Sequence, residues 1–200
     1  GWLGSSMNGS AISARSATST SQPPCAVAWP SNHSATGSPT RPGRVEATIR
    51  PNQILAVGGL PWPLLEGDRA RRVVDLVEAR LWTSLGLRTL APGAPGYRPR
   101  YEGGVLSRDG AYHQGTVWPW LMGPFISAYL FAFGETPSSI EFCQQLLEDM
   151  EQELAACCLG SLSEVYDGDE PHRPGGCPAQ LWSVAQLLIA RCRVDNAIEN

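Results

Sequence analysis

The chain contains no lysine, so all fifteen of its basic residues are arginines, and its formal net charge is −4. It has no basic cluster with interleaved aromatic residues, which disfavours nucleic acid as a partner. No apolar run reaches the length of a membrane span, and the N-terminus lacks the basic start and apolar stretch of a signal peptide. We therefore expect a cytoplasmic protein that acts on neither nucleic acid nor membranes.

Several familiar catalytic motifs are also missing, namely G-x-S-x-G, the P-loop, G-x-G-x-x-G and H-E-x-x-H. Serine-nucleophile, phosphate and hydride chemistry thus lose their usual sequence support. His113 has no second histidine at ligand spacing, and residues 167–172 match neither an EF-hand nor a zinc signature. We interpret that stretch as a solvated acidic turn, and we expect no metal and no cofactor.

The six cysteines contain no C-x-x-C pair, and most of them lie in segments with helical periodicity. An even number of cysteines is compatible with a disulfide framework. The spacing instead favours free, partly buried thiols in a reducing compartment.

Acidic residues are absent from residues 1–45, which are rich in Ser, Thr, Pro, Ala and Gly. These residues show no sustained helical or strand period, so we predict a low-complexity tail that is disordered or not native to the domain. Residues 46–200 carry every Asp and Glu of the chain. The folded domain is therefore predicted to begin at Glu46.

Helical patterns dominate the second part. Residues 51–59, 118–133 and 178–192 are mostly apolar, whereas residues 68–82 and 137–158 are amphipathic. The start of the last of these fits either a Ser138–Glu141 capping box or Thr136 followed by Pro137. Residues 85–108, rich in Gly and Pro, read as a long ordered loop. Alternation of buried with amphipathic helices predicts an all-α fold, a toroid of concentric helical hairpins.

Such a toroid has parallel inner helices, whose N-termini lie at one end. Three polar loops precede those N-termini, at residues 50–53, 109–118 and 164–176. We expect the three loops to converge on one mouth, where the helix N-termini add backbone donors and positive potential.

The middle loop is the most informative segment, because Asp109, Tyr112, His113, Gln114 and the indoles of Trp118 and Trp120 fall within twelve residues. Polar groups beside flat aromatic faces suit a sugar, whose hydroxyls need partners and whose C–H faces lie against rings.

Glu164 stands in the third loop, in the sequence Ser161-Leu162-Ser163-Glu164-Val165-Tyr166. A carboxylate between apolar side chains is a candidate general base, and glycoside hydrolysis needs two carboxyl groups. A surface or salt-bridged role is the commoner one for a lone glutamate.

Five stretches in order resemble one known family. They are Arg50-Pro51-Asn52-Gln53-Ile54-Leu55-Ala56, Gly86-Leu87-Arg88-Thr89-Leu90, Tyr101-Glu102-Gly103-Gly104, residues 108–125, and Gly176-Cys177-Pro178-Ala179-Gln180-Leu181-Trp182-Ser183-Val184. Together they are similar to the C-terminal amylo-α-1,6-glucosidase domain of the glycogen debranching enzyme family, over about residues 46–191.

The resemblance implies part of a glucoamylase-like (α/α)6 barrel, a six-hairpin glycosidase. It implies an inverting hydrolase that removes the α-1,6-linked glucose left at a glycogen branch point. By the family's pattern Glu164 is the general base. The pattern also gives substrate-binding roles to a set of loop residues: Asp109, Tyr112, His113, Gln114, Trp118 and Gln180.

The family's general acid is an aspartate in the upstream half of the barrel, which residues 1–45 do not match. We therefore expect an incomplete barrel that is inactive alone and that has the missing half as a partner. The alternatives are a non-catalytic glucan-binding module, a helical interaction fragment, or a toroid glycosidase with another linkage preference.

Trp118 and Trp120 are two residues apart and cannot share one helix face. One of them is expected to face the mouth and the other to pack, and the residues alone do not say which. Because the resemblance gives Trp118 a binding role, we predict that Trp118→Ala weakens sugar binding more than Trp120→Ala. A binding titration on both folded variants checks this, and equal losses would contradict it.

Overall fold

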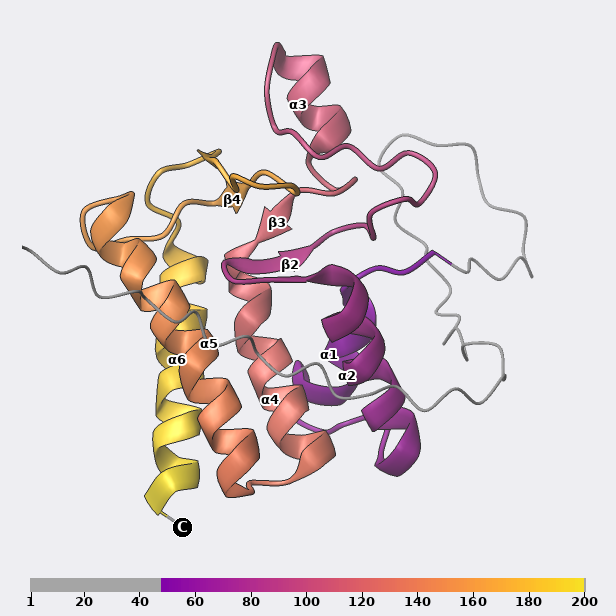
Figure 1. Cartoon of the computed structure of the whole chain (residues 1–200), viewed down its shortest axis with the longest axis vertical. Helices are drawn as coiled ribbons and strands as arrows, with labels where there is room; N and C mark the ends of the chain where they lie inside the picture. The colour runs from indigo at the N-terminus through magenta and orange to yellow at the C-terminus, as the bar shows by residue number, and fades with distance from the viewer. Residues whose placement is uncertain (1–47, 200) are drawn as a thin grey trace, which may run out of the picture.

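A computed structural model describes residues 48–199, so the predicted tail at residues 1–45 lies outside the described residues. In this part of the chain there are six α-helices, one short 3-10 helix and five very short strands (Figure 1). In chain order they are α1 (Asn52–Gly58), α2 (Gly67–Leu81), β1 (Trp82–Thr83), β2 (Gly86–Arg88), α3 (Val105–Ala111), β3 (Val117–Trp118), η1 (Pro119–Leu121), α4 (Met122–Phe133), α5 (Pro137–Ala156), β4 (Val165–Tyr166), β5 (Pro174–Gly175) and α6 (Leu181–Glu199).

Helix α4 is the centre of the fold. It contains no charged residue, and nine of its twelve residues are buried. A helix that is apolar on all sides must be covered on all sides, and α4 packs against α1, α2, α5 and α6. The predicted buried helix at residues 118–133 is thereby confirmed, with its first turn in the 3-10 form.

The other helices form two layers around α4. Helices α1 and α6 flank it, α2 packs on α1 and α4, and α5 packs on α4 and α6. Figure 1 shows α4 and α6 running away from the strands while α5 runs back toward them. The described residues are therefore mostly helical, as the sequence predicts, and the toroid stays a prediction.

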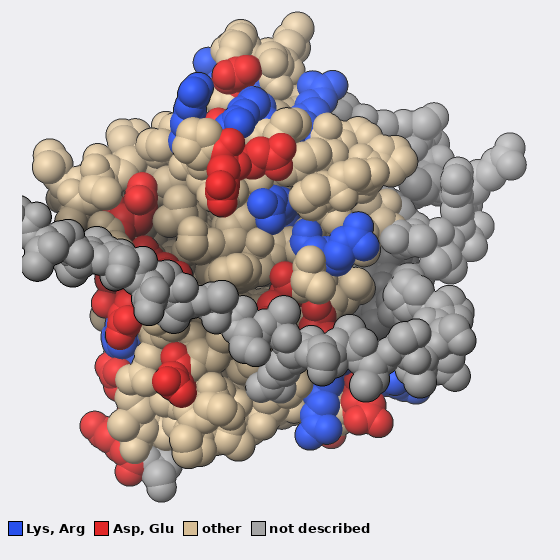
Figure 2. Space-filling model, viewed as in Figure 1, with Lys and Arg blue, Asp and Glu red and all other residues tan. Residues whose placement is uncertain are grey.

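Helix α5 is amphipathic and lies on the outside. Its buried residues include Cys143, Leu147 and Met150, and it carries acidic but no basic residues. Acidic side chains gather on this side of the surface in Figure 2. Thr136 caps the start of the helix, because its side chain accepts a hydrogen bond from Ser139 N–H. Pro137 is the first helical residue. Of the two predicted starts, the structure has Thr136–Pro137 and not the capping box.

Helix α6 departs from the prediction. It was expected to be buried, but several of its large apolar side chains are exposed: Leu181, Trp182, Leu188, Ile189 and Ile198. Leu187, Ala190 and Val194 face the core. The helix is half-covered because α4 and α5 pack on it from one side and no described element covers the other.

A small antiparallel sheet, in the order β1-β2-β3-β4-β5, closes one end of the helices. Leu87 pairs with Trp118 and Val117 pairs with Tyr166. Sequence periodicity did not reveal these strands, because two or three residues cannot display an alternating pattern. The sheet brings the second and third predicted loops together.

The backbones of α1 and α4 lie close together at Gly58. A Cβ atom there would collide with the backbone of Pro124 and Ala128, with Ala128 Cα only 2.6 Å away. We expect Gly58→Ala to lower the free energy of unfolding by about 1–3 kcal/mol through overpacking, measured by urea denaturation.

Gly110→Ala is the matched control, because Gly110 is also helical but meets only the movable end of the exposed Arg98 side chain. A destabilisation of the same size in both variants would contradict the packing argument.

Candidate active site

The first two predicted loops meet through Arg50. Its guanidinium donates to the carbonyl oxygens of His113 at 2.7 Å and Thr89 at 3.1 Å. It also donates to Gln114 Oε1 at 3.1 Å. Residues 50–53 and 109–118 therefore lie side by side at the start of α1, as expected for a shared mouth.

The third loop joins them through Glu164. Tyr112 Oη donates a hydrogen bond to Glu164 Oε1. Cys177 N–H donates to Glu164 Oε2 at 2.8 Å, and Glu164 N–H donates to Cys177 O at the same distance. Two donors thus fix the carboxylate, which is half-buried. The convergence of all three loops is confirmed for the described residues.

Gly176 allows this arrangement. Its φ is +70°, in the left-handed region that favours glycine. A Cβ atom at Gly176 would collide with the Glu164 carboxylate and lie 2.9 Å from Glu164 Cβ. The loop can close on Glu164 only because residue 176 has no side chain.

Aromatic rings surround this carboxylate. The Tyr112 ring lies 4.7 Å from that of Trp118 and 4.8 Å from that of His113. His113 and Trp118 stack with their planes 10° apart, and Trp118 Nε1–H donates to Tyr112 O at 3.0 Å. Four predicted site residues, Tyr112, His113, Trp118 and Glu164, therefore form one cluster, and Arg50 attaches Gln114 to it.

The remaining predicted residues lie at the edge. Asp109 is exposed on α3, close enough for its charge to contribute to the raised pKa of Tyr112. Gln180 N–H donates to the carbonyl oxygen of Leu162, two residues before Glu164, at 2.9 Å. The structure brings these two residues near the mouth without giving either a contact to the Glu164 carboxylate.

Two aromatic residues were missed by the sequence analysis. Trp182 is 47% exposed, and its ring lies 5.8 Å from Trp118 and 5.7 Å from Trp120. Tyr101 lies 5.7 Å from Tyr112. Tyr101 stands in the motif Tyr101-Glu102-Gly103-Gly104, and Trp182 stands in Gln180-Leu181-Trp182. The spacing of these residues in the sequence does not indicate that their rings lie at the mouth. Since Trp118 and Trp120 both contact Trp182, their relative weight in sugar binding stays a prediction.

Local electrostatics fix the protonation states of the mouth. Burial, then the hydrogen bond to Glu164, raises the pKa of the Tyr112 phenol, so it stays protonated and keeps donating. Partial burial, then the positive charge of Arg50, lowers the pKa of His113. A histidine with a pKa below its ordinary value of about 6.5 is neutral at pH 7.

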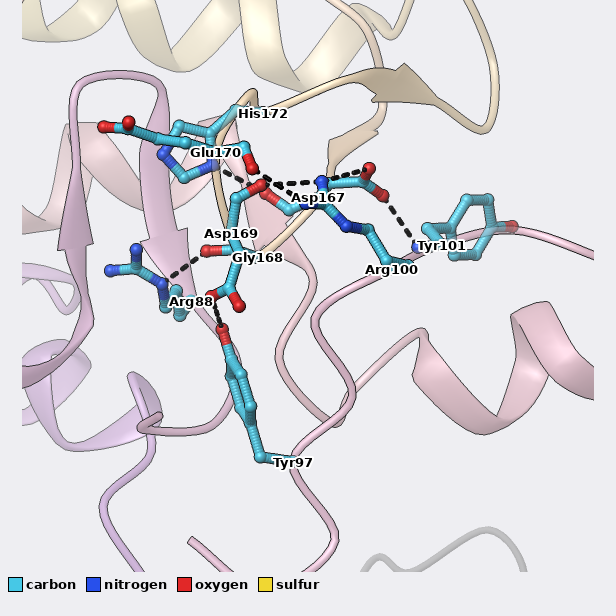
Figure 3. A network of polar contacts seen from close by, with 9 residues as sticks. All are labelled: Arg88, Tyr97, Arg100, Tyr101, Asp167, Gly168, Asp169, Glu170 and His172. Carbon is cyan, nitrogen blue, oxygen red and sulfur yellow. Dashed lines mark hydrogen bonds and ion pairs between the residues drawn. The ribbon is translucent and has the colours of Figure 1, made fainter. Parts of the chain in front are cut away.

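Part of the acidic stretch after β4 is a buried network (Figure 3). The predicted solvated turn was therefore wrong for Asp167 and Gly168, whereas Glu170 and Pro171 are exposed. Asp167 is 4% exposed. Its carboxylate pairs with Arg100 at 3.1 Å and accepts the Tyr101 N–H at 2.8 Å. His172 Nδ1–H donates to the Asp167 carbonyl oxygen at 2.7 Å.

The rest of this network ties the same turn to β2 and to residue 97. Arg88 donates to Gly168 O at 2.6 Å, and Tyr97 Oη donates to Asp169 Oδ1 at 2.7 Å. Burial and Asp169 together raise the pKa of Tyr97 to about 12. Sequence analysis overlooked this network because its partners stand 66 to 80 residues apart.

The described residues hold no group of three or more His, Cys, Asp or Glu side chains arranged for a metal ion. No helix among them is both long enough and apolar enough to cross a membrane.

We expect Asp167→Ala to lower the free energy of unfolding by about 1–3 kcal/mol, because it leaves the Tyr101 N–H and Arg100 without their buried partner. Urea denaturation measures this. Asp68→Ala is the control, since the Asp68–Arg71 pair is exposed at 4.0 Å and such pairs contribute about 0–1 kcal/mol. Equal effects would show that the Asp167 network does not stabilise the fold.

Comparison with known proteins places the chain in a family. The glycogen debranching enzyme of Saccharomyces cerevisiae is 31% identical over 160 residues, covering 70% of this chain. The chain spans about a tenth of the length of that relative. The amylo-alpha-1,6-glucosidase family matches residues 36–189, which include all the helices up to the last turns of α6 and every residue of the mouth. The chain is a member of the amylo-alpha-1,6-glucosidase family.

Proposed function

We propose that this chain is part of a glycosidase domain that removes α-1,6-linked glucose from branched α-glucans such as glycogen limit dextrin. The observation that carries the proposal is the half-buried Glu164 carboxylate, fixed by Tyr112 and the Cys177 amide among aromatic rings. Family membership supports the substrate class, and the relative's name supports the setting in glycogen debranching.

Glu164 is proposed as the general base of an inverting reaction. Each carboxylate oxygen accepts one donor from the protein, and a carboxylate has about four lone-pair sites. Lone pairs therefore remain to orient a water and take its proton while the water attacks the anomeric carbon. The leaving oxygen takes its proton from a second carboxyl group, about 6.5–9.5 Å from the first in inverting enzymes.

The glucose ring is proposed to lie beside the aromatic cluster of Tyr112, His113 and Trp118. Tyr112 is half-buried and His113 is exposed, so these two rings can offer polar edges to hydroxyl groups and faces to C–H surfaces. Trp118 is 4% exposed and supports His113 by stacking on it. Gln114, Asp109 and Gln180 are assigned to the rim, with Trp182 added from the structure. The exposed indole of Trp182 continues the aromatic surface outward from Trp118.

The second carboxyl group is proposed to come from the remainder of the domain, which this chain does not contain. We also propose that the whole domain is a six-hairpin barrel and that the isolated chain is inactive. The exposed apolar side chains of α6 support both proposals, because an edge helix with Leu188, Ile189 and Ile198 in water is suited to a covering layer. This same face also supports the alternative of a helical interaction fragment. A cytoplasmic location stays a prediction.

Glucose release from a branched limit dextrin tests the function. In a protein that includes this chain and the rest of its domain, we expect Glu164→Gln to lower kcat by about 10²–10⁴, the usual contribution of a general acid or base. Glucan binding should change little, because glutamine keeps the shape and the acceptor toward Tyr112.

Glu170→Gln is the matched control, since Glu170 is an exposed carboxylate on the same loop segment. Unchanged turnover in Glu164→Gln would remove Glu164 from the role of base. Full activity of the isolated chain would show that it supplies its own acid, and Asp109 would be the first residue to test.

A further inference from the structure

Two adjacent cysteines, Cys157 and Cys158, form a thiol pair at the end of α5. Their sulfur atoms lie 2.9 Å apart, so that one thiol donates a hydrogen bond to the other sulfur. Both residues are half-buried, whereas Cys143 is buried and Cys177 and Cys192 are exposed. Within residues 48–199, the structure brings the sulfurs of this pair into direct contact.

The backbone around the pair leaves the helix in a hydrogen-bonded turn, in which Gly160 N–H donates to Leu154 O at 2.8 Å and Ser161 N–H donates to Cys158 O at 3.2 Å. Helix α5 ends at Ala156, and Cys157 is its cap, with its N–H donating to Glu153 O at 3.1 Å. Leu159 is fully exposed with a φ of 49°, and Gly160 follows with a φ of 92°. Cys158 therefore lies between a helix end and a left-handed turn, where its side chain can rotate without breaking the helical hydrogen bonds.

Neighbouring Cα atoms stand about 3.8 Å apart across a trans peptide. Ordinary disulfides join Cα atoms about 4.4–6.8 Å apart. A bond between adjacent cysteines is therefore strained, and strained disulfides are readily reduced again. The pair is suited to a reversible modification and not to a permanent structural link.

We propose that Cys157 and Cys158 form a vicinal dithiol site that a hydroperoxide oxidises reversibly to an intrachain disulfide. The sulfur of one cysteine attacks a peroxide oxygen, the O–O bond breaks, and a sulfenic acid and water form. The second sulfur then displaces the hydroxyl group, which leaves as water with the second thiol proton. Two thiols and one hydrogen peroxide thus give one disulfide and two waters. A thiol reductant reverses the change.

The surroundings of Cys157 affect the order of attack. Burial, together with the hydrogen bond to Cys158, raises the pKa of Cys157 to about 12. Because the thiolate is the nucleophile, this shift disfavours Cys157 as the attacking sulfur. The proposal is independent of the glycosidase function.

The test uses the whole reduced chain. It is treated with a small excess of hydrogen peroxide, alkylated with iodoacetamide and cleaved with an endopeptidase specific for glutamate. Cleavage after Glu153 and Glu164 releases residues 154–164, which contain these two cysteines and no other. We expect this peptide to carry no alkyl group and to lose two hydrogens, and to regain two alkylation sites after dithiothreitol.

Cys158→Ser should leave one cysteine in the peptide and abolish the two-hydrogen loss, whereas Cys177→Ser, which removes an exposed thiol, should leave it unchanged. Two alkyl groups on the wild-type peptide, under peroxide that oxidises free dithiothreitol, would overturn the proposal. A disulfide to a different cysteine would overturn it as well.

A second measurement does not depend on a variant. Phenylarsine oxide condenses with two nearby thiols and releases water, with no change of oxidation state at sulfur. It should protect both cysteines of residues 154–164 from alkylation in the wild-type chain, at one arsenic per pair. Full alkylation in its presence would show that the two sulfurs do not act together.

Discussion

The burial of α4 is the constraint on which the rest of the structure depends. A twelve-residue helix without a charged side chain has no stable place at a surface, so other helices must enclose it. Packing of α1 and α6 beside α4, with α2 and α5 outside, satisfies that need. The backbones of α1 and α4 lie close together at Gly58 and leave no room for a methyl group there. Enclosing α4 in this way also fixes where the three inner helices begin.

The candidate site is a consequence of this arrangement. The loops before α1, η1–α4 and α6 have to lie together because the helices that they precede lie together. Arg50 then connects the first loop to the second, and Tyr112 connects the second to the third. Tyr112 and the Cys177 amide both donate to Glu164. The sheet adds a second connection, because β3, which contains Trp118, pairs with β4, which follows Glu164. The carboxylate is thus held from both sides of its own loop.

Helices with a long hydrophobic pattern could be predicted from the sequence. The pairing of short strands and the hydrogen bonds between distant residues could not. The helices at residues 68–82, 118–133 and 137–158 were found within a few residues of their ends, because each contains at least three turns of pattern. Helix α3 was not predicted because it begins within a segment rich in Gly and Pro, and the five strands were not predicted because two or three residues carry no period. Helix α6 was recognised as apolar, but its half-exposed state depends on what packs beside it.

The same distinction applies to the site. Tyr112, His113, Gln114 and Trp118 could be proposed because they are neighbours in sequence, and Glu164 because it stands in a family motif. The role of Asp167 was misjudged, because a carboxylate in an acidic run looks solvated until its partners Arg100 and Tyr101 are seen. Trp182 and Tyr101 were overlooked for a similar reason. Each of them belongs to the site because its ring contacts an aromatic ring from a distant segment.

The protonation states in the mouth constrain the mechanism that we propose. Tyr112 is a poor proton donor to substrate, since its pKa is raised and its proton is directed at Glu164. His113 is also a poor donor at pH 7, since its lowered pKa leaves the imidazole neutral. Asp109 is a carboxylic acid near the cluster, but its side chain is exposed on α3. We therefore propose the roles of base and of sugar binding for this part of the mouth. The acid of the inverting reaction is proposed to face Glu164 from the rest of the domain.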